Sequence, residues 1–176
     1  METTQKQKNL SYLLGVAGFV IGLILDQFSK YLAATDLKQS GPNVLINGVF
    51  QLRYLENRGA AFGIMQNKQY FFVIGAVIVL AVIAFFYTRM PFTKRYQPLR
   101  ICAVLLCAGA VGNMIDRIRL DYVIDFFYFN LIDFPIFNVA DCYVVVACIA
   151  FVLLILFYYK EDSESATIKL LVSWIN

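Results

Sequence analysis

The chain of 176 residues contains no histidine, and only 15% of its residues are charged. Without an imidazole, the sequence excludes catalysis by Ser–His or Cys–His pairs and makes a zinc site of the HExxH kind improbable. The four cysteines lie in or beside apolar runs without metal-binding or redox spacing, which favours a packing role. Any proton-transfer catalysis must therefore depend on carboxylates, lysine or tyrosine.

The scarcity of charge also argues against a soluble domain. Hydrophobic residues make up 60% of the chain, and its mean hydropathy is +0.67. The net charge of +3 is too small to suggest a nucleic-acid partner. We expect residues 1–176 to form a single membrane-embedded domain.

Four long apolar runs predict four transmembrane helices, at about residues 10–29, 70–87, 99–118 and 139–159. The expected fold class is therefore an all-α polytopic membrane protein. In the first outer loop, residues 44–55 alternate in hydrophobicity around a glycine, which predicts a small β-cradle. The apolar run 168–175 is too short to span, so residues 160–176 are expected to form a flexible or interfacial tail.

The last span opens with the segment Phe137-Asn138-Val139-Ala140-Asp141. Asn138 suits a helix N-cap, and an acid three residues later suits the positive end of the helix dipole. An aspartate inside a membrane span also marks a functional site by default. Taken alone, this segment favours the cap.

Other polar residues favour a functional site over a simple helix cap, because an antiparallel bundle brings them to one side of the membrane. They end the first span (Asp26, Lys30), precede the second (Asn57 to Gly63), end the third (Asn113, Asp116, Arg117) and begin the fourth. Unrelated caps and ion pairs would be expected on both sides, whereas the other side carries only basic charges. We therefore favour one shared site over separate structural contacts.

For Asp26 and Lys30 the structural alternative is an i, i+4 ion pair on one helix face. An acid at the C-terminal end of a helix opposes the dipole, which weakens that alternative. The basic cluster between the second and third spans predicts that both termini are cytoplasmic. The shared site would then lie at the extracytoplasmic face.

The polar blocks, in their order along the chain, resemble the type II signal peptidase family, the bacterial lipoprotein signal peptidases, which are membrane aspartyl proteases. The resembling blocks are Asp26-Gln27-x-x-Lys30, Asn57-x-Gly59-Ala60-Ala61-Phe62-Gly63, Gly109-Ala110-x-Gly112-Asn113-x-x-Asp116-Arg117, Val123-Ile124-Asp125-Phe126 and Phe137-Asn138-x-Ala140-Asp141. The resemblance implies that Asp125 and Asp141 are the catalytic pair. It assigns substrate-binding or supporting positions to Asp26, Lys30, Asn57, Gly59, Ala60, Phe62, Gly112, Asn113, Asp116, Arg117, Asn138 and Ala140.

The resemblance also implies an activity. The chain is expected to remove the signal peptide from diacylglyceryl-modified prolipoproteins in the bacterial cytoplasmic (inner) membrane, cutting before the lipidated cysteine. Its partners would be this precursor and membrane lipid, without a metal, a cofactor or an obligate protein partner. A small ion- or proton-coupled transporter is the alternative, since intramembrane carboxylates also mark ion paths. The apolar centres of the second and fourth spans argue against it.

Two positions depart from the family pattern. Ala108-Gly109 replaces the usual pair of glycines, and Asp121-Tyr122 replaces a glycine usual before the block that contains Asp125. The second change leaves the geometry of that turn open.

The aromatic residues after Asp125 predict that desolvation makes it the shared-proton donor, with Asp141 as the base towards water.

Overall fold

The computed structural model describes residues 5–59 and 68–159. Four long helices form a bundle: α1 (Gln5–Leu32), α3 (Gln69–Arg89), α4 (Gln97–Leu120) and α5 (Val139–Leu153). All four are long and apolar enough to cross a membrane once α5 is counted with its extension to Tyr158, so the prediction of four spans is confirmed. The proposed tail, 160–176, lies outside the described residues.

The first helix runs further than the sequence predicts. After Leu32 it continues through a π-helical turn, η1 (Ala33–Leu37), and a last turn, α2 (Lys38–Ser40), before Gly41 reverses the chain at φ +83°. Asp26 therefore lies well inside a helix, and the argument that it opposes the dipole at a helix end is wrong. Likewise, α5 continues into a π-helical turn, η5 (Leu154–Tyr158).

Small residues allow the helices to approach closely. A Cβ added to Gly22 of α1 would lie 3.2 Å from the Cβ of Ala108 on α4, and one added to Gly109 would lie 2.6 Å from the Ala140 carbonyl oxygen of α5. In lipid, such contacts replace the hydrophobic drive that packs helices in water. Helix α4 consequently packs against the other three helices.

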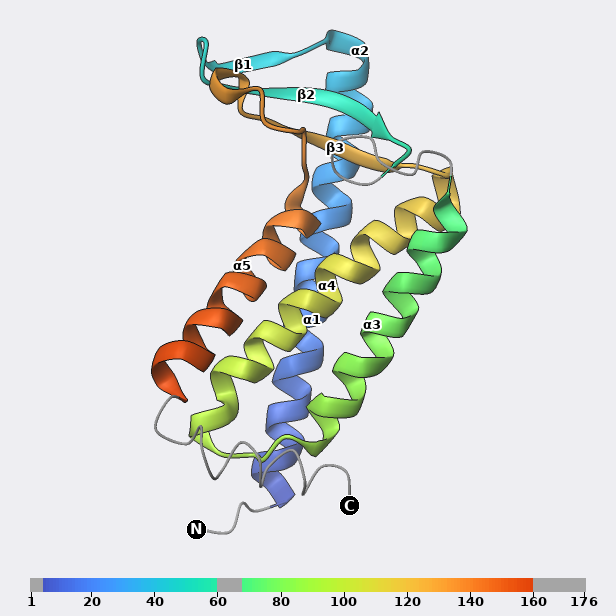
Figure 1. Cartoon of the computed structure of the whole chain (residues 1–176). Helices are drawn as coiled ribbons and strands as arrows, with labels where there is room; N and C mark the ends of the chain where they lie inside the picture. The colour runs from blue at the N-terminus through green and yellow to red at the C-terminus, as the bar shows by residue number, and fades with distance from the viewer. Residues whose placement is uncertain (1–4, 60–67, 160–176) are drawn as a thin grey trace.

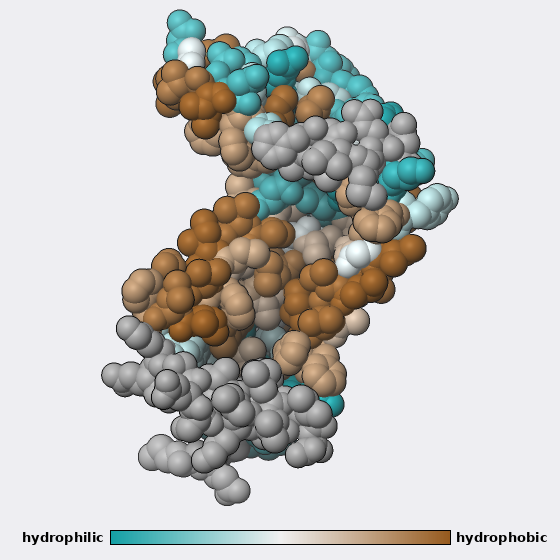
Figure 2. Space-filling view, viewed as in Figure 1, coloured by the Kyte–Doolittle hydropathy of each residue, from teal (hydrophilic) through white to brown (hydrophobic). Residues whose placement is uncertain are grey.

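The outer surface of the bundle is apolar, while polar residues gather over the sheet at one end (Figures 1 and 2). That sheet has three antiparallel strands in the order β1 (Asn43–Ile46), β2 (Phe50–Asn57) and β3 (Val123–Tyr128). The β1–β2 hairpin turns at Gly48, with φ +71°, and confirms the predicted cradle in the first loop.

Strand β3 comes from the loop between α4 and α5 and was not predicted. It pairs with β2 so that Asp125 faces Leu55 across the ladder. Ile124 and Phe126, its neighbours in the strand, pack with Ala33 of η1 in a small core. This packing fixes the position and orientation of β3, and therefore the position of Asp125.

The divergent turn before β3 is the C-cap of α4. Asp121 has φ +61° and ψ +17°, the left-handed conformation in which helices commonly end. Glycine adopts this conformation without strain, and aspartate is among the few other residues that visit it routinely. The turn thus keeps the geometry that a glycine would give.

Replacing Asp121 by glycine should therefore stabilise the protein by about 1 kcal/mol, because the left-handed conformation then carries no Cβ penalty. Asp121→Val should lower stability by a similar amount or more, since a β-branched residue is an outlier there. Thermal unfolding of the purified protein in detergent would measure both changes. Equal melting temperatures for the two variants would contradict the assigned turn.

Candidate active site

Asp125 projects from β3 into a buried polar site and is 1% exposed. The Asn57 side chain on β2 donates to its Oδ2 at 2.8 Å, and the Asn138 side chain donates to its Oδ1 at 2.6 Å. Each carboxyl oxygen of Asp125 thus has a hydrogen-bond donor. The pairing of β2 with β3 brings one of these donors, Asn57, next to Asp125.

Asp141 lies in the first turn of α5 and belongs to a reciprocal capping box. Its backbone N–H donates to Oδ1 of Asn138 at 3.0 Å, and the backbone N–H of Asn138 donates to Oδ2 of Asp141 at 3.1 Å. The Asn113 side chain on α4 donates to the other oxygen, Oδ1, at 2.8 Å. The expected cap is present, and it also holds the Asp141 carboxyl in one orientation.

Asn138 joins the two carboxyl groups. It is fully buried, caps α5 beside Asp141 and donates to Asp125 from the same side chain. Its amide also contacts Oδ1 of Asn113 at 3.1 Å. A strand from one loop and the start of a helix therefore present two carboxyls to a common site.

The electrostatics of Asp125 are unusual for a carboxyl group. Burial, and next the negative charge of Asp141, raise the pKa of Asp125 to about 7, although hydrogen bonds from Asn57 and Asn138 oppose the shift. Asp125 can therefore hold a proton near neutral pH. A carboxyl group that can hold a proton beside a second carboxyl group is typical of acid–base catalysis.

Behind this pair lies a buried ionic cluster centred on Lys30, which is 2% exposed. Its ammonium contacts Asp26 at 3.0 Å, Asp116 at 3.0 Å and Oδ1 of Asn113 at 2.9 Å. An ammonium has three donors, so this set satisfies it fully. The expected i, i+4 pair exists, but it is one edge of a larger cluster that also orients Asn113.

The two acids of this cluster hold backbone groups in place. Oδ1 of Asp26 accepts from the N–H of Ala140 in the first turn of α5 at 2.9 Å, and Oδ2 of Asp116 accepts from the N–H of Ile124 on β3 at 3.2 Å. A Cβ at Gly112 would collide with the Asp26 carboxylate. The cluster therefore ties α1 and α4 to both elements that carry Asp125 and Asp141.

Gln27 was quoted in the first motif but not assigned to the site. Its side-chain amide contacts Oδ1 of Asp116 at 3.0 Å, the Gly112 carbonyl at 3.2 Å and Oδ2 of Asp26 at 3.1 Å. A polar amide inside an apolar span, next to an acid, was a signal that could have identified it.

Arg117 lies one helical turn after Asn113, on the same face of α4. Its Nη1 donates to the Asn113 carbonyl at 3.2 Å, and its guanidinium lies 4.9 Å from the ring centre of Phe72 on α3. Nε has no hydrogen-bond partner among the residues that the structure describes. The positive charge of Arg117 acts on both Asp125 and Asp141.

The rim of the site is only partly described. The N–H of Gly59 donates to the side chain of Asn57 at 3.0 Å, and the buried Gln69 side chain donates to the Arg58 carbonyl at 2.7 Å. Ala60 and Phe62, two of the expected site residues, lie outside the described residues. The described part of the rim thus holds the Asn57 side chain in the orientation from which it donates to Asp125.

Comparison with known sequences identifies the family of the chain. A family model described as signal peptidase (SPase) II matches residues 18–157. A lipoprotein signal peptidase of Streptococcus thermophilus is 42% identical over 150 residues, covering 83% of this chain and 93% of the relative. Another from Caldanaerobacter subterraneus subsp. tengcongensis is 43% identical over 143 residues, covering 81% and 94%.

Solved structures agree as well. One, described as a bacterial membrane enzyme, has a TM-score of 0.73 at 32% identity and covers 86% of this chain and 92% of its own. A second has a TM-score of 0.70 at 33% identity, covering 82% and 93%. With a multi-pass membrane fold and a family match across most of its length, the chain belongs to the signal peptidase II family of proteases.

Proposed function

We propose that this protein is an aspartyl endopeptidase that removes the signal peptide from lipid-modified prolipoproteins, cutting before the lipidated cysteine. The observation that carries the proposal is the pair Asp125 and Asp141, joined through Asn138, with the pKa of Asp125 raised to about 7. The names of the relatives, lipoprotein signal peptidases, support the choice of substrate. Family membership favours a peptidase over the transporter alternative.

In the proposed mechanism Asp141 is the base and Asp125 the acid. Asp141 accepts hydrogen bonds from the Asn113 side chain and the Asn138 backbone N–H, which hold its carboxyl group in a fixed orientation. It removes a proton from water while the oxygen attacks the scissile carbonyl carbon, and Asp125 gives its proton to the carbonyl oxygen. Collapse of the tetrahedral intermediate breaks the C–N bond: one of its hydroxyl groups returns a proton to Asp125 as the new carboxyl group forms, and the proton held by Asp141 passes to the leaving amine.

The surrounding residues would position this pair. Asn57 and Asn138 orient Asp125, whereas Lys30 holds Asn113, which in turn holds Asp141. Arg117 contributes positive charge beside the pair, which would stabilise the negative charge that builds on the carbonyl oxygen before Asp125 protonates it. The substrate-binding roles of Gly59, Ala60 and Phe62, and the absence of a metal or cofactor, stay predictions.

The deciding assay uses the purified protein and a synthetic precursor carrying a diacylglyceryl cysteine. We expect a product that begins with the lipidated cysteine, identified by mass spectrometry, and no cleavage of the same precursor without lipid. Metal chelators and thiol blockers should leave the rate unchanged, because carboxylates carry the chemistry. Cleavage at another bond, or rescue by zinc after chelation, would refute the proposal.

The rate should depend on pH in a defined direction. The proton on Asp125 is needed, and the pKa of that group is about 7, so kcat/KM should fall about tenfold per pH unit once the pH exceeds this value. On the acidic side, protonation of the base should lower the rate again and give a bell-shaped profile. A rate that stays constant from pH 7 to 9 would rule out Asp125 as the acid.

The orientation in the membrane is a further prediction. Lys94, in the turn between α3 and α4, should face the cytoplasm, whereas Lys38 of α2 and Asp133, in the turn after β3, should face outside. All three residues are exposed, so single cysteines there can be labelled with an impermeant thiol reagent in a cysteine-free background. Labelling of position 94, but not 133, in intact cells would reverse the orientation.

A further inference from the structure

The buried side chain of Gln69, the first residue of α3, reaches back to the end of β2. It is 7% exposed, and its amide Nε2 donates to the Arg58 carbonyl at 2.7 Å. Glutamine is mostly exposed in proteins, and burying a polar group is unfavourable unless it is hydrogen-bonded. A buried amide beside the strand that ends in Asn57 therefore points to a specific task.

The peptide group between Arg58 and Gly59 carries this contact further. In a trans peptide the C=O and the N–H lie in one rigid plane and point in opposite directions, and the described residues contain no cis peptide bond. The C=O of this group accepts from Gln69, while its N–H donates to Oδ1 of Asn57 at 3.0 Å. The planar group thus links the position of Gln69 to the orientation of the Asn57 side chain.

From Asn57 the contacts lead to the carboxyl group of Asp125. Nδ2 of Asn57 donates to Oδ2 of Asp125 at 2.8 Å. The Gln69 amide, the 58–59 peptide and the Asn57 amide are therefore joined head to tail, and the last of them donates to Asp125. Hydrogen bonds in such a chain polarise one another, so the bond from Gln69 strengthens the bond that Asp125 accepts.

The Gly59 N–H also decides which end of the Asn57 amide faces Asp125. If this amide were turned by 180°, its oxygen would face Asp125, which would then lose a donor. Its NH2 group would face the Gly59 N–H, so that two donors would oppose each other. The peptide group that Gln69 holds thus keeps Asn57 as a donor to Asp125.

We propose that Gln69 is a positioning residue for the acid Asp125 and acts through the 58–59 peptide and Asn57; this role rests on the proposed peptidase function. Burial, and next the charge of Asp141, raise the pKa of Asp125, whereas the Asn57 bond lowers it. Without Gln69 the peptide group is less restrained and Asn57 donates less often, so the pKa of Asp125 should rise further. The contribution of Gln69 should therefore appear in the pH dependence of the reaction and not only in stability.

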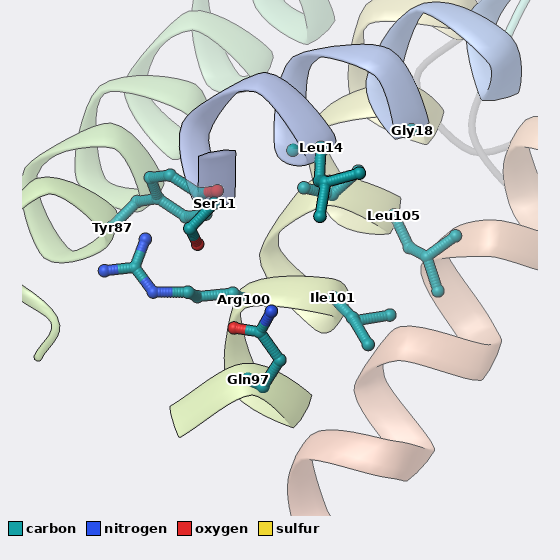
Figure 3. A pocket seen from close by; sticks show the side chains of 10 residues that line it. Ser11, Leu14, Gly18, Tyr87, Gln97, Arg100, Ile101 and Leu105 are labelled. Atoms are coloured by element: carbon teal, nitrogen blue, oxygen red, sulfur yellow. The ribbon is translucent and has the colours of Figure 1, made fainter. Parts of the chain in front are cut away.

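Gln69→Met tests this role, because methionine has a similar length but no amide. With the lipidated precursor, kcat should fall about 10–100-fold because Asp125 is less well placed. The alkaline limb of the kcat/KM profile should move up by about 0.5–1 pH unit, the size expected for part of one hydrogen bond to a charged group. Gln97→Met is the matched control, since Gln97 is the exposed first residue of α4, beside a hollow at the end of the bundle away from the sheet (Figure 3). It should keep the wild-type rate and profile.

A double-mutant cycle separates positioning from a purely structural role. If Gln69 acts through Asn57, adding Gln69→Met to Asn57→Ala should change kcat by about twofold or less, because the contact is already lost. An equal loss in both backgrounds, or an alkaline limb that does not move, would overturn the proposal. If Gln69→Met does not fold in detergent, Gln69→Asn gives the same comparison, because it keeps an amide that is one methylene too short to reach the Arg58 carbonyl.

Infrared titration provides a readout that needs no substrate. In protein with isotopically labelled aspartate, the protonated-carboxyl band that is missing from Asp125→Asn belongs to Asp125. Its midpoint should lie at higher pH in Gln69→Met than in the wild type, and should be unchanged in Gln97→Met. If the wild type does not cleave the precursor, the proposed function fails; an unchanged midpoint in Gln69→Met refutes the role of Gln69 whether or not the wild type is active.

Discussion

Asp125→Asn and Asp141→Asn are each expected to lower kcat by roughly 10³–10⁵-fold, because either change removes a proton-transfer step. The fold should survive, since asparagine has nearly the shape of aspartate and Asp125 is already able to stay neutral near pH 7. Turnover of the lipidated precursor measures the loss, and thermal unfolding in detergent confirms the fold.

The double variant sharpens this prediction. Residues that act as a unit are strongly non-additive, so losing both carboxyls should be little worse than losing one. Asp121→Asn is the matched control, because Asp121 lies in the same loop but is exposed at the C-cap of α4. It should keep most of the activity. An essential Asp121 with a dispensable Asp125 would overturn the assignment of the pair.

The second large effect concerns Lys30. Lys30→Met should destabilise the protein by ~3–5 kcal/mol, because it leaves Asp26 and Asp116 buried without a cation. Activity should fall with stability, since Asn113 loses the donor that orients it towards Asp141. Chemical unfolding in detergent gives the free energy, and turnover gives the activity.

An exposed ion pair supplies the control. Lys38 contacts Glu56 at 2.9 Å, but its side chain is 51% exposed, so Lys38→Met should change stability by ~1 kcal/mol or less. Adding Asp26→Asn and Asp116→Asn to Lys30→Met should recover part of the loss, because no buried charge is then left unpaired. If the triple variant were less stable than Lys30→Met, the Asp26 and Asp116 carboxylates would have to stabilise the fold through interactions other than their ion pairs with Lys30.

The features that could be predicted from the sequence are those set by local pattern. The four spans follow from long apolar runs, and the hairpin follows from alternation around Gly48. The capping box at Asn138 and Asp141 follows from their spacing at the start of an apolar run. In each case the residues that decide the structure are neighbours in the chain.

The features that could not be predicted depend on distant partners. Val123–Tyr128 forms a strand because β2, about seventy positions earlier, offers an edge, as the bond between Asn57 and Asp125 illustrates. Similarly, Lys30 has a local partner in Asp26, but its contacts with Asn113 and Asp116 depend on how α1 packs against α4. Spacing within one helix cannot reveal such contacts, and the bond from Gln27 to Asp116 likewise depends on the packing of α1 against α4.

The pairing of β2 with β3 sets an order of events during synthesis. The partners of Asp125 arise in two different loops at the sheet end of the bundle: Asn57 is made before α3, and Asn138 is made just before α5. A chain still emerging from the ribosome, with only its first two helices inserted, therefore holds none of the reactive pair. If Asp125 and Asp141 are the catalytic pair, as we propose, activity begins only after the last helix has been inserted and the loop before it has joined the sheet. Appearance of activity would accordingly report completion of the whole fold in the membrane.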